Sequence, residues 1–188
     1  MKLKLLLLIP PFLIGLQTNS PALTVLPLSE VELTKRATLI ATGVVEDVYS
    51  AHDPDRTTIL TYIKVRITET LKGKIEGPYA TLRQMGGVVG DEMVMVPGSP
   101  AYEPGEELLV FAGPLGKTGY FAVLGIFYGK YAIGTDPLSG RKIVSGPSFE
   151  TVHYDPETLE ALPVRERPDP VFLDDFLAEI RSYLHDAE

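Results

Sequence analysis

The sequence predicts a mostly β protein, a small antiparallel barrel with a short N-terminal helix and a C-terminal helix. The first observation is that apolar and polar residues alternate through 57–71, which is typical of a strand with one face on a core and one in water. The second is that strand-like apolar segments flank this stretch, at 38–49 and 78–85. The apolar positions of the alternating stretch are Ile59, Ile63, Val65, Ile67 and Leu71.

Residues 1–22 have the organisation of a signal peptide and are set aside from the fold. Lys2 and Lys4 make the start of the chain positive, an apolar run covers 3–16, and the small residues Ser20 and Ala22 occupy both key positions of a cleavage site. An uncleaved anchor is the alternative, but roughly 20 apolar residues are needed to cross a bilayer, and this run is shorter and holds two prolines. We therefore expect an extracytoplasmic protein, periplasmic or secreted, with no stable membrane anchor after cleavage.

The charge distribution argues against two classes of partner. The chain has a formal charge of −8, which becomes −10 once the two lysines of residues 1–22 are removed. Residues 23–149 hold 14 acidic and 12 basic side chains, whereas 150–188 hold 11 and 3. Nucleic acids and anionic membranes attract basic proteins, so neither is expected as a partner. No cysteine is present, so a packed core must stabilise the fold without disulfides.

The first elements of the domain are a capped helix and a bent strand. Ser29 and Glu32 have the spacing of a capping box, which predicts a short helix. The strand predicted over 38–49 changes its apolar phase at Gly43, as strands do at a bulge or sharp bend. Asp53-Pro54 then suits a type I turn into the alternating strand.

The middle of the chain predicts two more strands separated by a long loop. We expect a short strand over 79–85 and a compact apolar strand over 106–112 that is covered on both faces. Between them, residues 86–105 are rich in glycine and proline, which predicts a loop without regular structure of its own.

An aromatic-rich run over 120–133 completes the predicted five-stranded antiparallel barrel of about 38–133, and its glycines at 125 and 129 suggest bends. A strand over 142–145 is expected to pair back across a hairpin tip at Asp136-Pro137. Asp155-Pro156 predicts a further tip of the same kind.

The C-terminal part is predicted to be a proline-rich linker and an amphipathic helix over 162–188, after a barrel domain over 23–161. Asp169 is expected to cap the helix, with Pro170 in its first position. We expect the apolar stripe of this helix to pack on the barrel, the alternative being a partner protein. The stripe consists of Leu173, Phe176, Leu177, Ile180 and Leu184.

Three segments resemble the netrin-like type of OB barrel, the fold of the tissue inhibitors of metalloproteinases. They are residues 38–45 (TLIATGVV), 65–73 with its closing Leu-Lys-Gly, and 105–111 (GEELLVF). The chain also resembles a group of secreted bacterial proteins of unassigned function with the same Gly-Gly-rich loop. The animal inhibitors begin with a zinc-chelating cysteine, which this chain lacks, so the resemblance implies an OB-like fold and carries over no inhibitory residue.

No residue pattern predicts catalysis, a cofactor or a metal site. The three histidines, His52, His153 and His185, lack the i,i+4 spacing of a metal-binding helix and are expected to be surface residues. The chain has no Gly-x-Ser-x-Gly motif, which would mark a nucleophilic serine. We therefore expect a protein that is not an enzyme.

Residues 86–103 are the predicted functional segment. Met93, Met95 and Tyr102 lie there, and apolar side chains are costly to leave in water unless they fold back or meet a partner. Folding back onto the edge of the core is one interpretation, because methionine fills irregular gaps. The other is a non-catalytic binding or inhibitory module for another extracytoplasmic protein, for which the family resemblance suggests an extracellular protease.

The alternative function is a small extracytoplasmic enzyme or a carbohydrate-binding domain with its site on the barrel face. An enzyme of this kind would need carboxylates such as Glu46, Glu69 and Glu106 to meet across the barrel. Polar groups clustered around a deep pocket would favour this alternative. A flat apolar loop surface would favour the binding module.

We predict that the exported protein begins at or within a few residues of Leu23, because the cleavage site follows an interrupted apolar run. Intact-mass measurement or N-terminal sequencing of the exported protein tests this. A mass that retains residues 1–22 would contradict the prediction.

Overall fold

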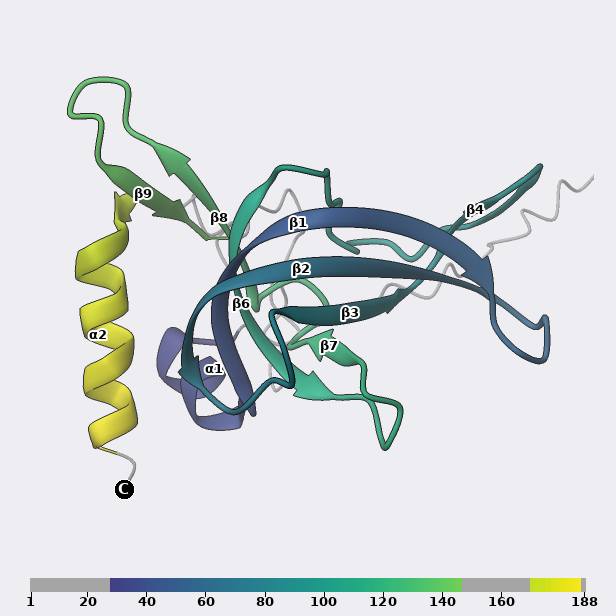
Figure 1. Cartoon of the computed structure of the whole chain (residues 1–188), viewed down its shortest axis with the longest axis horizontal. Coiled ribbons are helices and arrows are strands. Elements are labelled where there is room, and N and C mark those ends of the chain that lie inside the picture. The colour runs from purple at the N-terminus through teal and green to yellow at the C-terminus, as the bar shows by residue number, and fades with distance from the viewer. Residues whose placement is uncertain (1–27, 147–169, 187–188) are drawn as a thin grey trace, which may run out of the picture.

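The computed structural model describes residues 28–146 and 170–186, and most of its regular structure is strand (Figure 1). Mostly β content with two helices confirms the predicted class. The predicted leader, the Asp155-Pro156 tip and the linker up to Asp169 lie outside the described residues. In chain order the elements are α1 (Glu30–Arg36), β1 (Leu39–His52), β2 (Ile59–Lys72), β3 (Tyr79–Met85), β4 (Gly87–Val89), β5 (Glu92–Val94), β6 (Glu107–Pro114), β7 (Phe121–Val123), β8 (Lys130–Thr135), β9 (Lys142–Ser145), β10 (Val171–Phe172) and α2 (Leu173–His185).

Five strands form a ring in the order β1-β2-β3-β7-β6 and back to β1, which makes the sheet barrel-like (Figure 1). The pairings in the ring are antiparallel except between β3 and β7, which pair in parallel through Leu82 and Phe121 alone. The expectation of a wholly antiparallel barrel is therefore wrong at this junction. Strand β6 also pairs with β8, from which β9 and β10 continue the sheet beyond the ring.

The alternating stretch forms β2, as predicted. Ile63 and Val65 are buried on one face, while Lys64 and Arg66 on the other face are more exposed. Strand β1 pairs along β2, and its register shifts between Thr42 and Gly43, which confirms the predicted irregularity. A Cβ atom on Gly43 would lie 2.6 Å from the carbonyl oxygen of Arg66, so only glycine allows the two strands to approach so closely there.

Aspartates hold two of the predicted hairpin tips. The Asp53 carboxylate accepts N–H bonds from Thr57 at 2.6 Å and Thr58 at 2.9 Å in the turn between β1 and β2. The Thr58 N–H and the Thr57 hydroxyl lower the pKa of this carboxyl, because both bonds favour its charged form. Asp136 accepts the Ser139 N–H at 2.9 Å in the turn between β8 and β9. Each tip is thus closed by a charge-assisted contact.

Two segments differ from the sequence-based expectation. Residues 86–105 contain the β4–β5 hairpin and are therefore not without regular structure. Residues 120–133 form two strands, β7 and β8, joined by a tight turn that contains both predicted bends. Gly125 adopts a positive φ of 62°, and a Cβ atom on Gly129 would lie 2.4 Å from the carbonyl oxygen of Phe111. These glycines therefore break one run into two strands.

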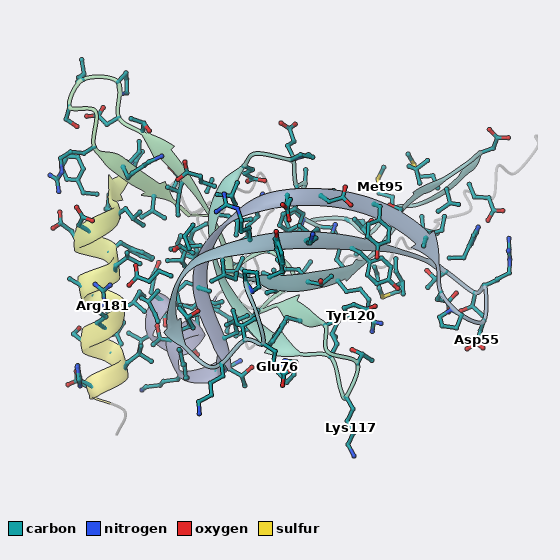
Figure 2. All side chains as sticks on the ribbon, viewed as in Figure 1. Asp55, Glu76, Met95, Lys117, Tyr120 and Arg181 are labelled. Carbon is teal, nitrogen blue, oxygen red and sulfur yellow. The ribbon has the colours of Figure 1, made fainter. Side chains whose placement is uncertain are left out.

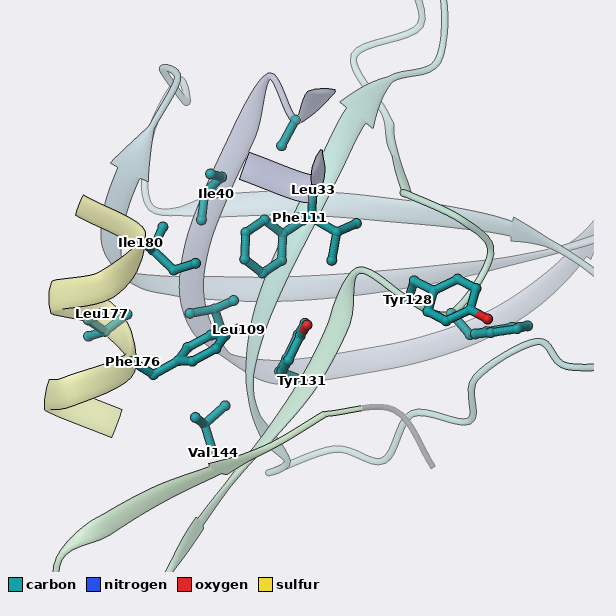
Figure 3. Close-up of a cluster of buried hydrophobic side chains, with 12 residues drawn as sticks. Leu33, Ile40, Leu109, Phe111, Tyr128, Tyr131, Val144, Phe176, Leu177 and Ile180 are labelled. Atoms are coloured by element: carbon teal, nitrogen blue, oxygen red, sulfur yellow. The ribbon is translucent and has the colours of Figure 1, made fainter. Parts of the chain in front are cut away.

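Apolar side chains form clusters on both faces of β6. Leu108, Val110 and Ala112 point into the ring, where they join Ile63, Val65 and Leu82 in what we call the ring core. Leu109 and Phe111 point the other way into a second cluster, the helix core, which α1 and α2 cover (Figure 3). The prediction that this strand is covered on both faces is confirmed. The buried helix-core residues are Leu33, Ala37, Ile40, Leu109, Phe111, Phe127, Tyr128, Tyr131, Val144, Phe176, Leu177 and Ile180.

Helix α1 begins with the predicted capping box. The Ser29 N–H donates to the Glu32 carboxylate at 3.1 Å, and the Glu32 N–H donates to the Ser29 hydroxyl at 3.3 Å. These reciprocal bonds satisfy backbone donors that the first turn of a helix leaves unpaired.

Helix α2 begins at Leu173, so the predicted cap at Asp169 with Pro170 in first position is wrong. Val171 and Phe172 pair with β9 instead, and these backbone bonds delay the start of the helix. The predicted apolar stripe packs into the helix core, with its three central residues buried. Among the described residues, no helix is long and apolar enough to cross a membrane.

We predict that Val65→Asp lowers the free energy of unfolding by about 3–5 kcal/mol, because it places an unpaired carboxylate in the ring core. Val88→Asp is the matched control, since Val65 is 0% exposed and Val88 is 53% exposed. Chemical denaturation of both variants tests the difference. Equal stabilities would mean that the inner face of β2 is not a core.

Candidate functional site

The large exposed apolar side chains concentrate in residues 85–95. Met85, Val88, Met93 and Met95, which we call the methionine surface, are between 53% and 75% exposed. Val88 and Met93 are directly paired across the β4–β5 hairpin, so their side chains lie on the same face of it. Figures 1 and 2 place β4 and Met95 toward one end of the molecule and α2 with Arg181 at the other.

Two glycines fasten the β4–β5 hairpin to β1 and β2. The Gly86 N–H donates to the Ile59 carbonyl at 2.8 Å, and the Gly86 carbonyl accepts the Thr61 hydroxyl at 2.7 Å. A Cβ atom on Gly87 would lie 2.3 Å from the Ser50 hydroxyl oxygen. The Gly-Gly pair therefore lets the hairpin backbone lie close against the Ser50 and Thr61 side chains, and it attaches the methionine surface to the ring.

Residues 95–102, which we call the strap, run from the hairpin back to the ring. Gln84 of β3 donates its side-chain amide to the Pro100 carbonyl at 3.2 Å. The Lys130 ammonium of β8 donates to the Ala101 carbonyl at 2.5 Å. The strap is thereby attached to strands on both sides, and its last residue enters the ring core.

Tyr102 is 9% exposed and packs in the ring core, so it does not belong to the methionine surface. Lys130 lies 4.4 Å from the centre of its ring and pairs with Glu106 at 2.6 Å. Burial raises the pKa of the Tyr102 phenol far above its usual value, with a smaller contribution from the Glu106 carboxylate. Of the three predicted contact residues, Met93 and Met95 are exposed and Tyr102 has folded back.

A pocket of about 280 Å³ lies where β3 and β7 barely meet, beside the strap. Its wall is mostly aliphatic, with four polar residues, Arg83, Gln84, Ser99 and Tyr102. Sequence reasoning missed this pocket because its walls come from four separate segments of the chain. The aliphatic lining residues are Leu60, Ile63, Leu82, Met85, Val96, Leu115, Ala122, Val123 and Ile126.

A row of tyrosines crosses the outer face of the sheet beside this pocket. The rings of Tyr49 and Tyr62, which are paired across β1 and β2, are stacked with centres 5.1 Å apart. Tyr120 meets Tyr62 edge-on at 5.3 Å, and the Arg83 guanidinium lies 5.2 Å from the centre of the Tyr120 ring. We call this row the tyrosine ladder, and Figure 2 labels Tyr120 within it.

Each carboxylate of the alternative hypothesis pairs with a different cation. Glu46 pairs with Lys64 at 3.1 Å, Glu69 with Arg181 at 2.5 Å, and Glu106 with Lys130. Within residues 28–146 and 170–186, no three His, Asp or Glu side chains are grouped to hold a metal ion. His52 ends β1 and His185 ends α2, while His153 lies outside the described residues.

No protein-family model matches the chain, and no curated protein matches it. The netrin-like resemblance of residues 38–112 therefore stays a prediction. The candidate functional features of the chain are the methionine surface, the pocket and the tyrosine ladder.

We predict that Gly87→Ala destabilises the protein by more than about 2 kcal/mol, because the new methyl group would collide with Ser50. Gly90→Ala is the control, since Gly90 also has a positive φ of 60° but has open space around it. It should cost about 1 kcal/mol. Urea denaturation of both variants compares them, and equal losses would show that the close approach at Gly87 is not needed.

Proposed function

We propose that the protein is a non-catalytic binding module that holds another extracytoplasmic protein through residues 86–103. The observation that carries this proposal is the methionine surface, four large apolar side chains exposed within one short segment. Burying apolar area stabilises a complex by about 25 cal/mol per Å², so such side chains favour a partner.

The anchoring of the hairpin supports the same proposal. Because Gly86 and Gly87 fix the hairpin on β1 and β2, the surface is formed before a partner arrives and loses little conformational entropy on binding. Methionine side chains adapt to irregular partner surfaces, which suits a binding role. The Tyr102 side chain folds back into the core, whereas the side chains of Met93 and Met95 stay exposed.

The family resemblance and the predicted leader suggest the kind of partner. A netrin-like OB barrel exported from the cytoplasm would meet extracytoplasmic proteins, and an extracellular protease is the partner that the resemblance implies. The ring of five strands is compatible with such a barrel. No inhibitory residue of that family is assigned to this chain, which has no cysteine.

The tyrosine ladder favours a second candidate, a carbohydrate-binding domain. Tyr49 is half exposed on the outer face of the sheet, and OB-type barrels bind oligosaccharides across such faces. A sugar ring can pack its apolar face against an aromatic side chain. Glycan binding that is lost in Tyr49→Ala and kept in a methionine-surface variant would favour this candidate over the first.

We predict that the double variant Met93→Ala with Met95→Ala keeps its melting temperature and loses partner capture by about tenfold or more, because full burial of a methionine side chain contributes about 1.5–3 kcal/mol. Capture from the native extracytoplasmic fraction, identified by mass spectrometry, measures this loss.

Leu138→Ala is the matched control, because Leu138 is 95% exposed on the distant β8–β9 tip. It should leave capture unchanged. A double variant that melts earlier would place the two methionines in the core. Unchanged melting together with unchanged capture would remove the methionine surface as an interface.

A further inference from the structure

The pocket between β3 and β7 opens at the weakest junction of the ring. Strand β3 pairs along its length with β2, but it meets β7 only through Leu82 and Phe121. The three residues of β3 after Leu82 all line the pocket. The gap between these strands therefore gives access from the surface to the apolar interior.

The inner wall of the pocket is core surface. Ile63 and Leu82 are fully buried in the ring core and still line the pocket, so a bound molecule would touch them directly. None of the lining residues is acidic. A volume of about 280 Å³ lies just below the usual range for small-molecule sites, which is about 300–1,000 Å³, so only a small ligand would fit. The volume and the aliphatic lining of the pocket suit one unbranched alkyl chain.

Arg83 provides a positive charge at this pocket that no carboxylate neutralises. In the part of the chain that the structure describes it forms no ion pair, whereas Lys64, Lys130 and Arg181 each pair with a glutamate. Its guanidinium carbon lies 5.2 Å from the centre of the Tyr120 ring, and its N–H groups make no hydrogen bond within the described residues. Those donors match the geometry of a carboxylate or a phosphate.

Tyr102 adds a second polar group to the pocket. It is about nine-tenths buried and lines the pocket, and its hydroxyl makes no hydrogen bond within the described residues. No side-chain polar atom of that part of the chain is both fully buried and unpaired, so this hydroxyl must be reached by solvent. The pocket therefore combines an aliphatic wall with a cation and a hydroxyl donor.

We propose that this pocket binds a single-chain anionic amphiphile, with its acyl or alkyl chain against Ile63 and Leu82 and its anionic head at Arg83. The chemistry shared by a fatty carboxylate and an alkyl phosphate satisfies both parts of the pocket, the apolar wall and the unpaired arginine. A neutral apolar side chain from a partner protein would satisfy only the wall. Of the methionine surface only Met85 lines this pocket, so the site is distinct from the contact that Met93 and Met95 are proposed to make.

The test uses the full chain with three ten-carbon probes, decanoate, decyl phosphate and decanol, measured by isothermal titration calorimetry or native mass spectrometry. At least one anionic probe should bind about tenfold or more tightly than decanol, because a charge-assisted hydrogen bond is worth that much. The anionic probe that binds more tightly, decanoate or decyl phosphate, identifies the preferred headgroup. Octanoate should bind about fifteenfold more weakly than decanoate, since it lacks two methylenes and each buried methylene contributes about fourfold.

Arg83→Gln should remove the preference for the anionic probe and leave decanol binding unchanged. Arg66→Gln is the control with the same loss of charge, because Arg66 is exposed on β2 and does not line the pocket. Ala122→Leu should fill the pocket and abolish binding of all three probes. If Ala122→Leu does not fold, the comparison of Arg83→Gln with Arg66→Gln still tests the proposal.

Three results would overturn the proposal. They are equal binding of decanol and both anions, an anion preference that survives Arg83→Gln, and no binding of any probe at millimolar concentration. The last result would favour an apolar side chain of a partner protein as the occupant of the pocket. The double methionine variant should bind decanoate normally, which separates this site from the proposed protein-binding function.

Discussion

The close approach of β1 and β2 at Gly43 is the contact on which the rest of the structure depends. Strand β1 pairs with β6 through residues 39–44 and with β2 along most of its length, so it must change direction where the two pairings meet. Any side chain at Gly43 would press on the Arg66 carbonyl and on Val65. Strand β1 would then separate from β2, and both apolar clusters, which share β1 and β6, would lose one wall.

The ring of strands has one junction with little backbone pairing, between β3 and β7, and the candidate sites lie near this junction. Strands β1 and β6 share six residue pairs, while β3 and β7 share one, so side chains complete the closure there. Tyr102 fills the interior, and Gln84 and Lys130 hold the strap from opposite strands. The same sparse pairing leaves the pocket open, and β3 leads directly into the β4–β5 hairpin. Met85, at the end of β3, is exposed in the methionine surface and also lines the pocket, so the two sites are adjacent.

Sequence patterns predicted those helices and strands that are determined by their own residues and near neighbours. The alternation from Ile59 onward, the capping box at Ser29 and the phase change at Gly43 each express a contact between near neighbours or a single strand face. The start of α2 could not be predicted, because pairing of Val171 with β9 overrides the cap signal at Asp169. The pocket was equally out of reach, since its walls meet only in the folded ring. The sequence left open whether Met93 and Tyr102 fold back or face solvent, and only the folded chain separates the exposed Met93 from the buried Tyr102.

Strand β6 carries apolar side chains on both faces, and this limits where the protein can be truncated or fused to another. A fragment that stops at Ser145 would keep the ring but leave Phe111 and Leu109 without the cover of α2. An uncovered apolar sheet face is prone to aggregation. Soluble expression of the ring alone would therefore require polar replacements on that face, and any fusion partner is better joined beyond His185 than before Val171.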